Sequence, residues 1–131
     1  LAPLEGVRLV WLDDAADRFP AEVPPKVQAR VVPALASAAA SAPKDAHHCI
    51  FTYSHAYDFA ICDALLHRGF ASAGLIGSET KRARFRSRLG QNGHQSAAIE
   101  RIACPIGDKR LGKQPQAIAV GIACGLLMTM A

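Results

Sequence analysis

Short apolar runs alternate with helical segments along most of this chain, and this alternation constrains the fold more than any other feature of the sequence. Four runs have the length and residue types of strands, at residues 7–12, 28–32, 49–53 and 72–76. We expect helices at residues 33–42, 56–68, 79–91 and 96–102, and a last helix from Pro115. Strands that alternate with helices form parallel sheets, so we predict an α/β, Rossmann-like three-layer domain with a mostly parallel sheet.

Length and composition agree with that class. A chain of 131 residues suffices for one domain with its own core, and we treat residues 1–131 as a single unit. Half of the residues are hydrophobic but only 6% are aromatic, so burial depends on Ala, Val, Ile and Leu, which argues against disorder and an all-β fold. The chain begins at Leu1 within an apolar, proline-containing phrase, which indicates a fragment of a longer protein.

The cysteines and the longest apolar run bear on location. Cys49, Cys62, Cys104 and Cys124 show no C-x-x-C spacing, so we expect reduced thiols and a cytoplasmic protein. The uncharged run at residues 117–131 is shorter than the ~20 residues that span a bilayer. We therefore expect a helix buried in the core or in an interface, and no membrane.

Positive charge is concentrated in one part of the chain. Residues 68–113 carry ten basic and three acidic residues, a balance of +7, whereas the remaining residues sum to −3 and the whole chain to +4. This distribution favours a phosphorylated small ligand over a long nucleic-acid track.

The strongest local motif is GLIGS at residues 74–78, followed by Lys81 and Arg84. Glycines at a strand-to-helix turn let the backbone approach a ligand, and the start of the helix offers free N–H groups and the Ser78 hydroxyl. Lys81 and Arg84 are three residues apart and share a helix face. The alternative is a tight turn followed by an ordinary solvated helix face.

A second polar turn, at residues 52–55, follows another predicted strand. Ser54 is placed to cap the next helix, while His55 and Asp58 share a face near its start. In a doubly wound sheet this turn should face the same crevice as Gly77 and Ser78. The alternative is simple capping, with Asp58 complementing the helix dipole.

Other reactive side chains support no metal site and no catalytic set. His47 and His48 beside Cys49 lack a second ligand pair at zinc-finger spacing, so no metal is expected. Ser54 and His55 are sequence neighbours, and neighbours in a turn seldom form a nucleophile and its base. From the residues alone, the prediction is an anion-binding α/β domain.

Three stretches together resemble a known family. The stretches TYSHAYDFAICDALLHRGFASAGLIGSETKRARFRSRL (52–89), ACPIG (103–107) and KQPQAIAVGIACGLL (113–127) look like the carboxyl-terminal domain of the xanthine dehydrogenase accessory factor family, XdhC/CoxI. That domain has, in this order, a T-H-x-x-x-D-like turn, G-L-I-G-S-x-x-K-x-x-R, C-P-I-G and a P-x-x-I-A helix. The resemblance implies a Rossmann-like domain of cytoplasmic proteins that bind molybdenum cofactor (molybdopterin), support its sulfuration and deliver it to molybdenum hydroxylases.

The resemblance also implies which residues line the cofactor crevice. With the helix cap Ser54, the candidate cofactor-binding residues are Thr52, Ser54, His55, Asp58, Gly74, Gly77, Ser78, Lys81, Arg84, Cys104, Pro105 and Gly107. The pterin phosphate is expected at the helix start after Gly77 and Ser78, with Lys81 and Arg84 as counter-charges. Asp13 resembles the acid that ends the second Rossmann strand, but Asp14 and Ala15 stand where the family has an arginine.

The implied protein is a carrier and maturation factor without turnover of its own. Its expected partners are a xanthine dehydrogenase-type molybdoenzyme and a cysteine desulfurase; neither a membrane nor a nucleic acid is expected. The alternative is an NAD(P)-dependent oxidoreductase domain, motivated by Asp13, although the G-x-G-x-x-G phrase it requires does not occur in the chain. An RNA-binding module using residues 82–88 would lack interleaved aromatics beyond Phe85.

One part of the family's domain has no counterpart here. That domain begins with a strand and a G-x-G-H-like phosphate loop, so we expect a domain that lacks both. In a Rossmann-like order the first strand belongs between the strands at 7–12 and 49–53. Either these two strands pair directly, or their edges recruit another chain, with marginal stability, self-association to a homo-oligomer and weak phosphate binding as consequences.

Overall fold

The computed structural model describes residues 1–131 and contains strands and helices in alternation. The strands are β1 (Leu9–Asp13), β2 (Val27–Val31), β3 (His47–Ile50), β4 (Ser72–Leu75) and β5 (Ile102–Ala103). The helices are α1 (Leu35–Ala40), α2 (His55–Arg68), α3 (Glu79–Gln91), α4 (Ser96–Ile99) and α5 (Pro115–Met130), with short 3-10 helices η1 (Ala16–Arg18) and η2 (Lys109–Leu111). The predicted α/β class is confirmed.

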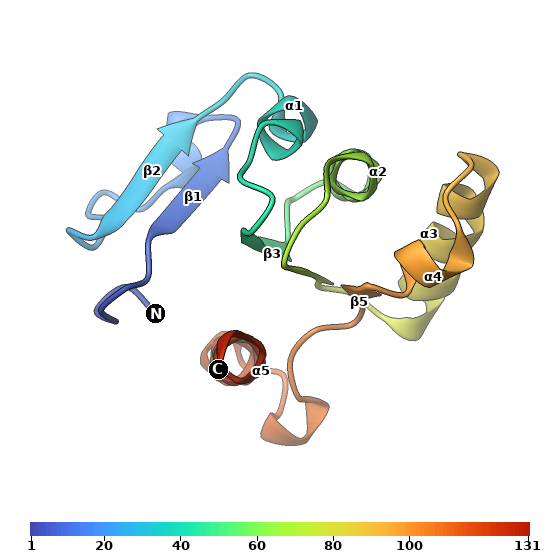
Figure 1. Ribbon diagram of the computed structural model, residues 1–131. Coiled ribbons are helices and arrows are strands. Elements are labelled where there is room, and N and C mark those ends of the chain that lie inside the picture. The colour runs from blue at the N-terminus through green and yellow to red at the C-terminus, as the bar shows by residue number, and fades with distance from the viewer.

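Every strand pair is parallel, as predicted, but the strands form two sheets. β1 pairs with β2, and β3, β4 and β5 form the second sheet in that order. Figure 1 shows the smaller sheet on one side of the molecule. In the same view α1 and α2 lie together over one face of the larger sheet, and α5 lies on the opposite side of that sheet. β1 and β3 do not pair, so each keeps one unpaired edge, and of the two alternatives direct closure of the sheet does not occur.

The hydrophobic core lies almost entirely around the larger sheet. Its thirteen buried residues come from α1, α2, α3, α4, β3, β4, β5 and the turn at Phe70, and none comes from β1, β2 or α5. Leu65 of α2, Leu75 of β4 and Leu89 of α3 are almost completely buried. Burying one such side chain contributes about 1.5–3 kcal/mol, so this half of the molecule holds most of the packing energy.

The two long helices of this half begin and end where the sequence places them. α3 matches the predicted range 79–91, and α2 begins one residue before the predicted 56–68. Ser54 and Ser78 cap the two helices through their hydroxyl oxygens, and Gly69 ends α2 with φ of +92°.

The strand predicted at residues 49–53 is shifted, since β3 ends at Ile50. Thr52 donates its backbone N–H to the Asp58 carboxylate at 2.9 Å, so this part of the chain belongs to the turn before α2 and not to the sheet. Phe51 and Tyr53 are consequently exposed, at 55% and 54%.

The last helix also differs from expectation. α5 is not buried in the core: Val120, Leu127 and Met128 are exposed, and Gly121 is its only buried residue. Gly121 lies so close to the preceding loop that a Cβ atom there would stand 2.7 Å from the Asp108 backbone nitrogen. The helix is thus anchored closely at Gly121, while its other apolar residues are half-buried or exposed rather than enclosed in the core. None of the helices, α5 included, has both the length and the apolar character of a membrane-spanning segment.

We expect the smaller sheet to unfold before the rest of the chain, because it has two strands and no fully buried residue. Trp11, the only tryptophan, lies in β1 and reports on this sheet. In a urea titration, Trp11 fluorescence should change at lower urea than the helical circular dichroism signal. Coincident midpoints would show instead that the two sheets unfold as one cooperative unit.

The unpaired edges of β1 and β3 predict association with another chain, because exposed strand edges pair readily. Sedimentation velocity over a range of protein concentrations should show a sedimentation coefficient that rises with concentration. A chain that stays monomeric throughout would refute this expectation.

Candidate functional site

The two polar turns identified in the sequence lie side by side. β3 and β4 are parallel neighbours, with Ile50 opposite Leu75, so the turns after their carboxyl ends meet at the same edge of the sheet. Between them is an open cleft of about 340 Å³. Its lining residues are Thr52, His55, Asp58, Ile76, Gly77, Ser78 and Lys81.

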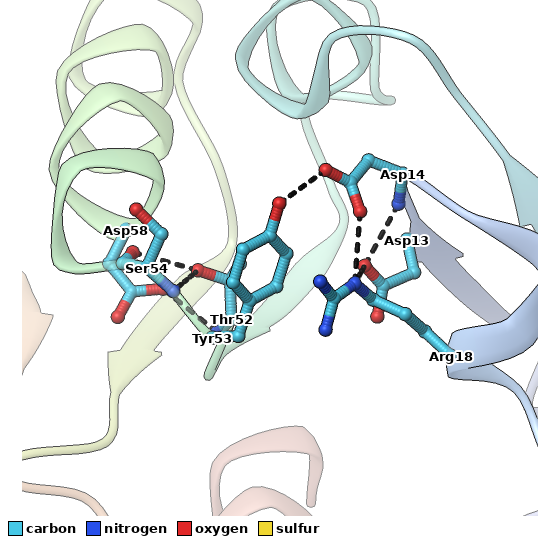
Figure 2. Close-up of polar contacts among 7 residues, drawn as sticks. All are labelled: Asp13, Asp14, Arg18, Thr52, Tyr53, Ser54 and Asp58. Atoms are coloured by element: carbon cyan, nitrogen blue, oxygen red, sulfur yellow. Dashed lines mark hydrogen bonds and ion pairs between the residues drawn. The ribbon is translucent and has the colours of Figure 1, made fainter.

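The first turn is held by reciprocal hydrogen bonds. The Thr52 hydroxyl donates to the Ser54 carbonyl oxygen at 2.9 Å, and the Ser54 N–H donates to the Thr52 hydroxyl oxygen at 3.1 Å. The Ser54 hydroxyl oxygen then accepts the Tyr57 N–H at 3.3 Å and caps α2. Figure 2 shows Thr52 and Ser54 close to Asp58. These bonds fix the turn and leave other N–H groups of the first helical turn without intrahelical partners.

The second turn is shaped by the lysine that follows it. The Ser78 hydroxyl oxygen accepts the Lys81 N–H at 3.2 Å and caps α3. A Cβ atom on Gly77 would come within 2.7 Å of Lys81 Cδ, so a larger residue would displace the lysine side chain. Glycine at position 77 is therefore required for Lys81 to fold back over the turn.

An ion pair joins the two turns. Lys81 Nζ lies 2.7 Å from Asp58 Oδ2, and both side chains are buried, at 8% and 1% exposure. Lys81 also donates to the Ile76 carbonyl oxygen at 3.1 Å, while Asp58 accepts the Thr52 N–H through its other oxygen. The pair thus bonds to the backbone on both sides of the cleft and holds the two helix starts at a fixed separation.

This geometry revises the roles predicted for three residues. The ammonium of Lys81 is neutralised by Asp58, so it is not a free counter-charge for a ligand phosphate. Asp58 bonds to Thr52 and Lys81 rather than to His55, so no imidazole–carboxylate pair forms. His55 is exposed at the cleft and is its only imidazole.

The other predicted residues lie outside the cleft lining. Ser54 acts as the cap of α2, and Arg84 is exposed on α3 with no acidic partner. Gly74 is buried in β4 directly against Ile106, because a Cβ atom there would clash with that side chain. Cys104, Pro105 and Gly107 belong to the loop after β5, and none of them lines the cleft. Partial burial raises the pKa of Cys104, which favours an unreactive thiol at neutral pH.

A second polar cluster, at the ends of β1 and β3, was not predicted as a unit. Tyr53 donates its hydroxyl to Asp14 at 2.6 Å, and the Arg18 guanidinium lies 3.4 Å from the centre of the Tyr53 ring. Arg18 also contacts Asp13 at 3.7 Å and Asp14 at 3.2 Å. Figure 2 shows these groups reaching across from the smaller sheet to the turn after β3.

The same contacts alter the titration of this cluster. The hydrogen bond from Tyr53, with help from Arg18, holds the pKa of Asp14 below its ordinary value, and that bond raises the pKa of Tyr53. The i, i+4 spacing of Asp14 and Arg18 was the only sequence signal for the cluster. The residues directly after Asp13 include no arginine, but the fold places the Arg18 guanidinium beside the Asp13 carboxylate.

The cleft is lined mainly by polar groups. Two hydroxyls, one imidazole and the starts of two helices surround it, and helix starts favour anions. Because Lys81 and Asp58 neutralise each other, the groups of the cleft that are suited to an anion are the N–H dipoles and His55 rather than a buried charge.

The ion pair gives a direct stability prediction. Lys81→Met should lower the free energy of unfolding by about 3–5 kcal/mol, because Asp58 remains charged and buried without its partner. The double variant Asp58→Asn with Lys81→Met should be less destabilised than Lys81→Met alone. Arg84→Ala, an exposed cation on the same helix, should change stability by less than about 0.5 kcal/mol. Urea unfolding measures all three; equal losses for Lys81→Met and Arg84→Ala would contradict the buried pair.

Comparison with known proteins identifies the family. No curated protein matches this chain. The fold is similar to the crystal structure of a xanthine dehydrogenase from Bacillus halodurans, with a TM-score of 0.74, 22% identity, and coverage of 94% of this chain and 35% of that chain. This chain therefore spans about a third of that protein, and the likeness establishes a shared fold. The family model of the XdhC Rossmann domain matches residues 1–126, and the chain therefore belongs to the XdhC family.

Proposed function

We propose that this domain binds molybdenum cofactor as cargo, in the cleft between the starts of α2 and α3, during the maturation of a xanthine dehydrogenase-type molybdoenzyme. The observation that carries the proposal is the convergence of two capped helix starts on one open polar cleft in a chain of the XdhC family. The cleft lies at the carboxyl ends of parallel strands, which is where open α/β folds bind their ligands.

The donor set of the cleft suits the phosphate of the pterin. Ser78 brings a hydroxyl, the first turns of α2 and α3 bring N–H groups, and His55 brings an exposed imidazole, whereas the Thr52 hydroxyl already donates its proton to Ser54. The Asp58–Lys81 pair acts on this set indirectly, since it holds the two turns apart without contributing net charge.

Arg84 has a different part in this proposal from the one that the sequence suggested. It stands outside the cleft lining, and it is exposed without an acidic partner, so it attracts an approaching anion without a fixed contact. His55 and the helix starts then provide the contacts at short range.

The proposed partners are the molybdoenzyme that receives the cofactor and a cysteine desulfurase that supplies sulfur, with the cytoplasm as the location. The Cys104 thiol is partly buried and its pKa is raised, so this side chain is a poor acceptor of sulfur in the isolated domain. In this proposal the domain holds the cofactor, and sulfur chemistry occurs on other groups.

A binding titration tests the proposal. Molybdenum cofactor released anaerobically from a purified molybdoenzyme should bind the chain, and His55→Ala should weaken binding about tenfold, because one hydrogen bond to a charged group is lost. His67→Ala is the matched control, since His67 is an exposed histidine at the other end of the same helix. EDTA in all samples removes free metal ions from the comparison.

The outcomes separate this proposal from the dehydrogenase alternative. Equal affinity of His55→Ala and His67→Ala for the cofactor would refute the cleft as its site. Binding of NADH or NADPH with no binding of molybdenum cofactor would instead favour the oxidoreductase domain.

A further inference from the structure

Three potential metal ligands meet at the end of the molecule away from the cleft. Asp63 and His67 lie four residues apart on α2, and His94 follows α3 in the next loop. One ligand atom from each lies within 4.8 Å of the other two. The rings of His67 and His94 are 4.6 Å apart between centroids, which places both imidazoles on the same side of α2.

The distances are close to those of a tetrahedral metal centre. Asp63 Oδ1 lies 2.7 Å from His94 Nε2 and 3.9 Å from His67 Nε2. With metal–ligand distances of about 2.0–2.2 Å, ligand atoms of a tetrahedral Zn²⁺ stand about 3.3–3.6 Å apart. The contact of Asp63 with His94 would lengthen by about 0.6–0.9 Å and its contact with His67 would shorten by about 0.3–0.6 Å. Rotation of the exposed His67 and the partly exposed Asp63 side chains can supply these shifts.

The backbone brings these residues together by two separate devices. The i, i+4 spacing on α2 puts Asp63 and His67 on one helix face. After α3 the chain turns at Gly93, whose φ of +93° is a left-handed conformation that glycine adopts at little cost. This turn points both Asn92 and His94 at Asp63, with Asn92 Nδ2 donating to the carboxylate at 3.3 Å.

Burial also suits a metal ion. The His94 side chain is 8% exposed and fixed in place, Asp63 is 31% exposed, and His67 is 70% exposed and free to move. The exposed side of the cluster leaves room for a water molecule as fourth ligand.

We propose that Asp63, His67 and His94 bind a divalent first-row transition metal ion such as Zn²⁺, with water completing the coordination. Two imidazoles and one carboxylate form a donor set that suits Zn²⁺ and its neighbours better than Ca²⁺ or Mg²⁺. The ion ties the carboxyl-terminal half of α2 to the turn after α3. Its role is structural and independent of the cleft, which lies around the opposite end of α2.

Sequence spacing alone did not point to this site. His47, His48 and Cys49 were the obvious cluster in the sequence, whereas His94 is 31 residues from Asp63. Only the packing of α2 against the loop after α3 brings the third ligand into range.

Titration of the chain with Zn²⁺ and with Co²⁺ as a spectroscopic probe tests the proposal. One equivalent of metal should bind and raise the melting temperature as its concentration increases. Bound Co²⁺ should show the visible absorption of a tetrahedral nitrogen and oxygen site without a thiolate charge-transfer band. His67→Ala should weaken binding at least about tenfold, while its metal-free melting temperature stays unchanged because the side chain is exposed.

The controls separate this site from other metal-binding groups. His55→Ala removes an exposed histidine at the start of the same helix and should leave metal affinity unchanged. His94→Gln, which keeps a polar side chain in the buried position, should lose binding as His67→Ala does. Equal metal affinity of the unaltered chain and His67→Ala would overturn the proposal, as would a thiolate band that disappears in Cys49→Ser or Cys124→Ser.

Discussion

The buried ion pair between Asp58 and Lys81 is the interaction on which the candidate site depends. It spans the cleft, bonds to backbone on both sides, and sets the separation of the starts of α2 and α3. A buried pair of this kind adds little net stability relative to apolar residues, but it allows only one arrangement of its partners. The pair therefore acts mainly by fixing the positions of the two polar turns, which would otherwise be joined only through the sheet.

The basic residues of the chain do not form one patch directed at the cleft. Lys81 is neutralised by Asp58, Arg82 and Arg86 both reach Glu100, and Arg88 stacks on Phe59. Arg84 is left as the cation of α3 without such a partner. The excess of positive charge between residues 68 and 113 is thus divided among several local contacts, and only part of it is available to attract an anion.

Besides the packing of Leu12 of β1 and of Val32 against the main core, the two sheets are joined by polar contacts of a weaker kind. The Asp14–Tyr53 hydrogen bond and the Arg18 stack cross from β1 to the turn after β3; Tyr53 and Arg18 are exposed, and Asp14 is half-buried. Exposed polar contacts contribute little free energy, whereas the core of the larger sheet buries thirteen hydrophobic residues. The cleft and the proposed metal site both belong to the well-packed half, so neither depends on how firmly the smaller sheet is held.

The sequence by itself determined the local elements and the family. We predicted the parallel α/β fold, the bounds of α3 and the pairing of the two turns from the apolar periods, the caps at Ser54 and Ser78 and the order of the motifs. These features depend on neighbouring residues.

Tertiary structure decided which charges meet. Lys81 turns inward to Asp58, 23 residues away, and His94 reaches Asp63, because the packing of helices on a sheet sets contacts that no local spacing encodes. It also decided that α5 stays outside the core, since its apolar residues predict burial but the rest of the chain covers them only in part.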